Sequence, residues 1–148
     1  MLDLVFQNFT TDRSSGRNFF NKVLKASISE LSLDAKKIEV GINLVGEDKI
    51  KELNSRYRDK DKVTDVLSFP LDDKIVERHG ILALGDIFIC LSFAKNEAKS
   101  ENVSIDKKLA QLAVHGFLHL LGYDHERSKK DAEKMFGLEN KILNKLNG

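Results

Sequence analysis

Apolar and polar residues alternate along residues 38–44, where Ile, Val, Ile and Leu occupy every second position. This period of two predicts a strand with one buried face. Three more apolar stretches predict strands: residues 2–6, residues 66–69 before a proline, and residues 81–91, which are apolar on both faces apart from Asp86. We expect the last two strands to form a hairpin joined by the polar loop 72–80.

Much of the remaining chain has apolar residues at helical spacing. Apolar residues recur every three or four positions over residues 20–31, 50–57 and 135–146, and residues 92–100 also favour a helix. Ser104 and Ser128 have the position and chemistry of N-caps for the last two helices. This order of elements predicts an α+β domain, with a small mixed sheet of about four strands and helices packed over it.

Length and composition limit the class of protein. We expect one domain spanning residues 1–148, because no stretch resembles a linker or a repeat. The single cysteine, Cys90, excludes an internal disulfide, fits a reducing compartment and is expected in the core. No run of residues resembles a signal peptide or a membrane helix, so we expect a cytoplasmic protein without a membrane partner.

The net charge of the chain does not by itself indicate a binding partner. The net charge is +1, whereas nucleic-acid-binding proteins are often strongly basic. Residues 49–62 contain six lysines and arginines, but Glu52, Asp59 and Asp61 lie among them. By charge alone, this segment favours a solvated helix face and loop over a binding surface.

Histidines provide the candidate chemistry. Residues 115–125 read H-G-F-L-H-L-L-G-Y-D-H and hold three of the four histidines of the chain; the fourth, His79, is expected to be an exposed bystander. His115 and His119 share one face of a helix, one turn apart. Gly122 can end that helix in a left-handed conformation, after which the chain can bring His125 back.

Three imidazoles without a fourth protein ligand are the composition of a catalytic zinc site. A single histidine on an apolar helix is more often a residue with a satisfied hydrogen bond. Here, residues 112–121 are otherwise apolar or glycine, and two buried imidazoles in such a helix are costly unless something binds them. We therefore predict a metal site on a central helix and the loop after it, with one zinc ion on His115, His119 and His125.

Zinc in such a site favours hydrolysis, because it lowers the pKa of bound water from roughly 16 to about 7. The histidines and Gly122 match the metzincin protease pattern H-E-x-x-H-x-x-G-x-x-H in register. Gly116, however, stands where those proteases carry the glutamate that acts as general base. Glycine cannot transfer a proton, so we expect it to serve close packing or access to the metal, and peptide cleavage is disfavoured.

The motif 115–125 resembles the signature of the YbeY family, bacterial zinc-dependent endoribonucleases of ribosomal RNA maturation. Two further blocks are similar to that family: L-N at 53–54 with Y-R-D-K-D at 57–61 and T-D-V-L-S-F-P at 64–70, and L-G-D-I-F-I at 84–89. Together the three blocks span residues 53–125. Gly116 belongs to the family pattern, which accounts for the missing glutamate.

This resemblance implies a zinc-dependent endoribonuclease specific for single-stranded RNA. It implies action at the 3′ end of small-subunit ribosomal RNA and in ribosome quality control. The implied partners are ribosomal RNA and the small ribosomal subunit, with ribosomal proteins or GTPase assembly factors as further candidates and no DNA. It implies zinc on His115, His119 and His125, and it makes Arg58 and His115 the catalytic candidates.

The chemistry of Arg58 agrees with that role, because a guanidinium can place two parallel hydrogen bonds on the oxygens of a phosphodiester as negative charge builds there. Without the family context, an arginine at a helix end would be a solvent-exposed charge. The general acid and base are open between Asp65, Asp86, Asp124 and solvent. Asp124 is also a candidate to orient His125, Asp65 to cap a turn, and Asp86 to pair with a ligand imidazole, a backbone amide or Arg58.

Two other functions are compatible with the residues. One is a zinc hydrolase of another substrate class, such as a metalloprotease-like enzyme. The other is a non-catalytic ribosome-assembly factor whose zinc only holds the C-terminal turn.

Overall fold

A computed structural model describes residues 1–72 and 75–147 of the chain. Its elements follow in the order β1 (Leu2–Asn8), α1 (Arg17–Glu30), β2 (Lys37–Val45), α2 (Glu47–Arg58), β3 (Val66–Pro70), β4 (Glu77–Arg78), β5 (Ile81–Cys90), α3 (Leu91–Glu101), α4 (Ile105–Leu120) and α5 (Lys129–Asn147).

The strands form one mixed sheet in the order β1-β2-β5-β3, and the two-residue β4 pairs with β5. β1, β2 and β5 run parallel, whereas β3 and β4 are antiparallel to β5. The predicted α+β class with a small mixed sheet is confirmed, and so is the pairing of the last two long strands. Sequence periodicity did not reveal β4, which is too short to show a pattern and lies inside the predicted loop 72–80. Residues 73–74 of that loop lie outside the described residues.

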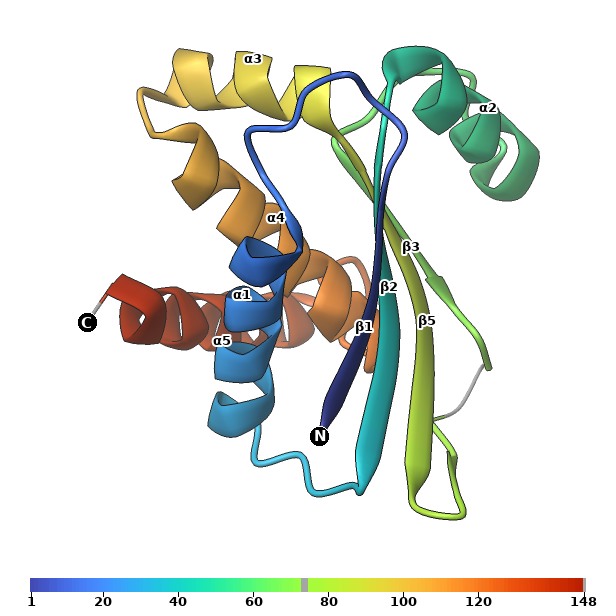
Figure 1. The fold of residues 1–148 in the computed structure, drawn as a ribbon, viewed down its shortest axis with the longest axis vertical. Coiled ribbons are helices and arrows are strands. Elements are labelled where there is room, and N and C mark those ends of the chain that lie inside the picture. Colours follow the sequence, from blue (N-terminus) through green and yellow to red (C-terminus); the bar gives the residue numbers. More distant parts are fainter. Residues whose placement is uncertain (73–74, 148) are drawn as a thin grey trace.

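Helices cover the two faces of the sheet unequally (Figure 1). α1, α4 and α5 pack on one face, and α2 lies alone on the other. The main core lies between the sheet and α1, α4 and α5, and it also includes Leu91 and Ala94 of α3. A smaller core under α2 contains Val45, Ile50, Leu53, Leu67 and Cys90, so the cysteine is a core residue as expected.

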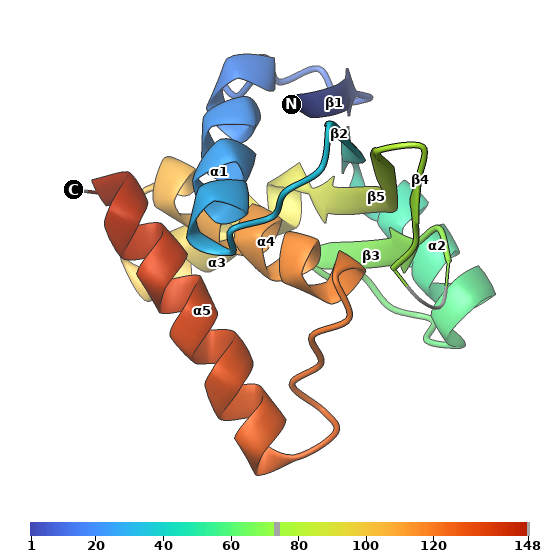
Figure 2. The ribbon, with the colours of Figure 1, turned by 90° about the horizontal axis from the view of Figure 1, so that it is seen from below.

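α4 is the central helix, with ten of its sixteen residues buried. Its predicted cap is confirmed, because the Ser104 hydroxyl accepts a hydrogen bond from the Lys107 amide at 3.1 Å. Ser128 likewise accepts from the Asp131 amide at 3.0 Å where α5 begins. Viewed from below, a loop leads from the end of α4 to the start of α5, and α5 then runs back past α4 toward α1 (Figure 2).

Gly116 lets α4 approach the sheet closely. A Cβ atom at this position would lie 2.9 Å from Ile87 Cγ2 and 3.1 Å from Ser68 Oγ, and the Gly116 carbonyl accepts a hydrogen bond from the Ser68 hydroxyl at 3.0 Å. The close-packing role expected of this glycine is therefore confirmed. A side chain here would point at β3 and β5, so position 116 could not present a general base without moving the sheet.

Asp86 corrects one expectation. Ile87 faces α4, so its neighbour Asp86 points to the opposite face of the sheet. There Asp86 is exposed, and its nearest polar partner is the Asn43 side-chain amide at 3.4 Å. The expected pairing with an imidazole, a backbone amide or Arg58 is wrong, because the apolar run of β5 does not show that α2 covers only part of that face.

Among the described residues, no helix is both long enough and apolar enough to cross a membrane.

Candidate metal centre and cleft

The end of α4 has the geometry that brings three histidines together. Gly122 adopts a φ of 95°, in the left-handed region that favours glycine. Its amide donates to the His119 carbonyl at 3.0 Å, and the Tyr123 amide donates to the Leu118 carbonyl at 3.1 Å. These two bonds close the helix end in a Schellman motif, and the chain then turns back toward α4.

His115, His119 and His125 meet after this turn. The Nε2 atoms of His115 and His119 lie 3.1 Å apart, and one ring nitrogen from each of the three residues lies within 4.8 Å of the others. His79, the fourth histidine, is exposed in the turn between β4 and β5. The structure thus gathers the three predicted ligands and leaves out the predicted bystander.

The state of these nitrogens fits a metal ion. Burial, followed by the nearby His115 and His125, lowers the pKa of His119 to about 4, so its ring is neutral at neutral pH. The Nδ1 atom of His125 is buried and has no hydrogen-bond partner among the described residues. The neutral ring of His119 and the unpartnered nitrogen of His125 are compatible with a divalent ion, and this cluster could bind one.

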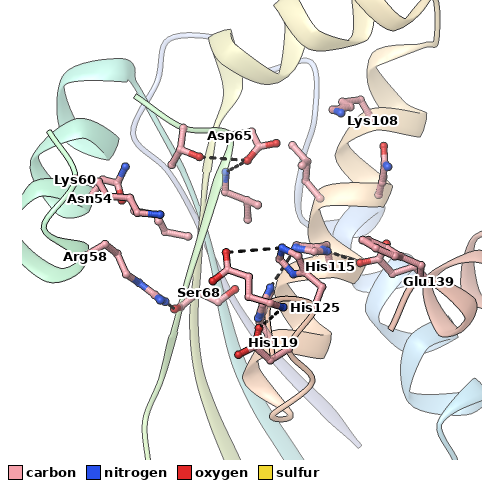
Figure 3. A pocket seen from close by; sticks show the side chains of 18 of the residues that line it. Asn54, Arg58, Lys60, Asp65, Ser68, Lys108, His115, His119, His125 and Glu139 are labelled. Carbon is pink, nitrogen blue, oxygen red and sulfur yellow. Dashed lines mark hydrogen bonds and ion pairs between the residues drawn. The ribbon is translucent and has the colours of Figure 1, made fainter. Parts of the chain in front are cut away.

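Glu139 of α5 is a site residue that sequence analysis missed. Its side chain is only 8% exposed, and its Oε1 atom contacts His115 Nδ1 (Figure 3). A carboxylate on the second ring nitrogen of a ligand histidine fixes the ring orientation and leaves Nε2 free to bind metal. The sequence held one signal for it: Glu139 interrupts the apolar stripe of the last helix between Met135 and Ile142.

The histidines lie in a cavity of about 660 Å³. Its walls come from α2, the loop after it, β3, α4, the loop after α4, and α5. Figure 3 shows Arg58, Lys60 and Asn54 on the α2 side and Glu139 on the opposite side, with the histidines between them. Lys62 also lines the cavity. Three of the six basic residues of segment 49–62 therefore line the cavity, contrary to the interpretation of this segment as a solvated surface alone.

Arg58 lies in this wall at the last position of α2. Its Nη2 atom donates to the Ser68 carbonyl at 2.6 Å, and its guanidinium carbon lies 5.7 Å from the centre of the Phe69 ring. The charge of Arg58 also contributes to the lowered pKa of His119. The structure thus brings Arg58 into the same cavity as the histidines, with other guanidinium N–H groups available to a ligand.

Two of the three candidate carboxylates reach the cavity. Asp65 and Asp124 line it, whereas Asp86 lies on the far face of the sheet. Asp65 accepts a hydrogen bond from the Val66 amide at 2.7 Å, consistent with its expected turn role. Asp124 accepts from the Glu126 amide at 2.8 Å and stabilises the turn rather than a histidine ring.

A three-histidine cluster at the end of a buried helix, open to a cavity with arginine and lysine in its wall, has the chemistry of a metal-dependent hydrolase acting on an anionic substrate. The family model described as "Endoribonuclease YbeY" matches residues 5–147. The chain belongs to this family, and the resemblance seen in its motifs is confirmed.

Named relatives support this membership. A protein named Endoribonuclease YbeY from Persephonella marina is 40% identical over 135 residues, which cover 91% of this chain and 86% of that protein. One of the same name from Staphylococcus saprophyticus is 42% identical over 146 residues, which cover 92% of this chain and 95% of that protein. The solution structure of TM1509 from Thermotoga maritima matches with a TM-score of 0.65 and 30% identity, covering 95% of this chain and 87% of that one.

Proposed function

We propose that this chain is a zinc-dependent endoribonuclease that cuts single-stranded RNA, acting in 3′-end maturation of small-subunit ribosomal RNA and in ribosome quality control. Residues 1–148 would form one such domain, working in the cytoplasm. The observation that carries the proposal is the meeting of three imidazoles and Arg58 in one cavity, in a chain of the YbeY endoribonuclease family.

His115, His119 and His125 would hold the zinc ion. Bound zinc lowers the pKa of a water molecule to about 7 and so provides a nucleophile at neutral pH. Glu139 would hold the His115 ring by its Nδ1 side. His115 would thus act through the metal, as a ligand whose ring a residue of α5 holds in place.

Arg58 would bind the phosphodiester at the site of cleavage. Negative charge builds on the non-bridging oxygens as the phosphorus becomes five-coordinate, and a guanidinium can meet two oxygens at once. The contact of Arg58 with the Ser68 carbonyl holds its side chain at the wall before substrate arrives. Proton transfer would fall to Asp65, Asp124 or solvent, since Asp65 and Asp124 line this cavity and Asp86 does not.

Ribosomal RNA and the small ribosomal subunit are the proposed partners, with ribosomal proteins or GTPase assembly factors as further candidates. The cationic wall of Arg58, Lys60 and Lys62 suits a polyanion. Because the net charge of the whole chain is only +1, long-range attraction to RNA is weak. Specificity would then depend on the cleft and on partner proteins.

The test is cleavage of ribosomal RNA, single-stranded and structured, and of casein by the purified protein with and without a chelator. We expect cutting of single-stranded RNA that the chelator abolishes and zinc restores, and no cutting of casein. Cleavage of casein would favour the metalloprotease-like alternative. A folded, zinc-loaded protein that cuts no RNA would instead support the non-catalytic assembly factor.

A further inference from the structure

Phe136 is an exposed aromatic side chain in a cavity lined mainly by polar groups. It is 46% exposed, and among the described residues that line the cavity it is the one exposed apolar side chain. The other apolar residues of the lining, Val66, Leu67 and Leu112, are buried or half-buried. Phe136 belongs to neither hydrophobic core, so core packing does not account for an aromatic ring at this position.

α5 fixes the position of this ring relative to the histidines. Phe136 precedes Glu139 by three residues, so both project from the same side of the helix. Glu139 contacts His115, and the Phe136 ring centre lies 6.0 Å from the His125 ring centre at an interplanar angle of 42°. Met135, which is fully buried, anchors the same turn of α5 in the core. The ring therefore lies beside the three histidines, on a helix turn that the buried Met135 anchors.

The cavity wall of Arg58, Lys60 and Lys62 carries positive charge, and Figure 3 shows Arg58 and Lys60 on the side away from Glu139 and α5. A strand of nucleic acid lying over the histidines would turn its phosphates toward the cations. Its bases would then face α5. Aromatic side chains bind unpaired bases by stacking, and they do so with little dependence on sequence because every base has a π face.

We propose that Phe136 forms a nucleobase subsite, on which the unpaired base next to the cleaved bond stacks. This inference rests on the proposed ribonuclease function and adds to it a source of single-strand selectivity. A base within a duplex is already stacked on both sides and cannot lie on the ring without leaving its pair.

No other exposed aromatic side chain competes for this role among the described residues. Tyr57 is 59% exposed, but its ring packs edge-on against Phe69 at 5.4 Å and does not line the cavity. Phe9, which follows the last residue of β1, is 65% exposed and also lies outside the cavity. Phe9 therefore provides a matched control, an exposed phenylalanine whose loss leaves the cleft intact.

The first test compares zinc-loaded wild type, Phe136→Ala, Phe136→Trp and Phe9→Ala on a single-stranded RNA oligonucleotide. We expect Phe136→Ala to raise KM about tenfold, equivalent to about 1.4 kcal/mol, with little change in kcat. Phe136→Trp and Phe9→Ala should stay close to wild type. Zinc content and Tm should be equal in all four proteins, which separates loss of stacking from loss of structure.

The second test moves an abasic nucleotide along the RNA, one position at a time around the cut. At one position next to the cut, the missing base should cost wild type about tenfold in kcat/KM and cost Phe136→Ala nothing further. The same penalty in both proteins at every position, or an unchanged KM for Phe136→Ala, would overturn the subsite while the nuclease function stands. If wild type with zinc cuts no RNA, the proposed function fails, and the subsite fails with it.

Discussion

Arg58 reaches the cavity from the last position of α2, where its guanidinium donates to the Ser68 carbonyl 2.6 Å away. Lysine at this position would keep the charge but lose the planar fork that meets two oxygens. We therefore predict that Arg58→Lys keeps its zinc and its fold while kcat on single-stranded RNA falls about 10²–10³-fold. Single-turnover cleavage with measured zinc content checks this.

Arg56→Lys is the control for that change, because Arg56 is exposed on α2 and lies outside the histidine cavity. It should cut RNA at the wild-type rate. Full activity in Arg58→Lys would remove the guanidinium from the reaction.

Glu139 is buried and contacts His115 from a separate helix. Glu139→Gln keeps the size of the side chain but removes the carboxylate that, under the proposed function, orients the His115 ring and increases its basicity as a zinc ligand. We predict that zinc affinity falls about 10–100-fold, measured by competition with a chromogenic chelator. Glu133→Gln, an exposed position of the same helix, should bind zinc like wild type. Equal affinity in both variants would show that Glu139 only fills space.

The sequence contains the three histidines as a recognisable unit because one helical turn and one glycine bring them together. Glu139 is 24 residues from His115, and nothing local links them. Only the packing of α5 against α4 creates that contact, so it escapes any analysis of spacing within one element. Arg58 shows the same limit, since its place near the histidines depends on how α2 and β3 meet.

α4 packs tightly against the sheet at Gly116. Gly137 of α5 is a contrasting position, because a Cβ atom there would meet nothing within 4 Å. Gly137→Ala should stabilise the fold by about 0.5–1 kcal/mol through helix propensity. Gly116→Ala gains the same propensity but forces a methyl group against Ile87 and Ser68, so we predict a net loss of about 1–2 kcal/mol. Urea unfolding of the two variants measures the difference.

If both alanines stabilised the protein equally, α4 would not be packed as closely as described. A loss of stability in Gly116→Ala alone supports the account in which this glycine serves packing rather than chemistry.

α3, α4 and the segment before β3 meet at a cluster of charges. Burial, then Asp65, raises the pKa of Glu97 to about 7, while Lys108 acts in the opposite direction and Glu101 adds to the rise. Between pH 4.5 and about 7, the folded protein therefore keeps a proton on Glu97 that the unfolded chain has released. Stability from this group is present below pH 4.5 and is lost as the pH rises toward about 7.

We predict that Glu97→Gln removes this loss. The free energy of unfolding of the metal-free variant should exceed that of metal-free wild type by more at pH 7.5 than at pH 5, measured in urea. All other titrating groups are shared, so the difference between the two proteins isolates Glu97. A difference that is the same at both pH values would contradict the raised pKa.

At the level of elements, periodicity and capping residues predicted the main helices and strands, because those signals are local. Local signals could not predict that Asp86 is exposed on the face of the sheet that α2 covers only in part. Strand order and the partial cover by α2 decide it, and both depend on contacts between distant segments.

At the scale of the whole molecule, several separate elements bring a wall with Arg58, Lys60 and Lys62 and a cluster of three histidines together in one cavity. The fold class followed from the order of elements, and the family from three separate motifs. The cavity could not be predicted from the sequence, because Arg58, Lys60 and Lys62 occur there only as part of a mixed charged segment. The proposed function therefore depends on how the fold arranges these basic side chains around the three histidines.

Zinc titration of the metal-free protein, with cleavage of single-stranded RNA as the readout, tests the central claim most directly. We predict that activity rises in proportion to added zinc and stops rising at one equivalent per chain. Cleavage that is independent of zinc content, or a protein that binds no zinc at its three histidines, would contradict the account.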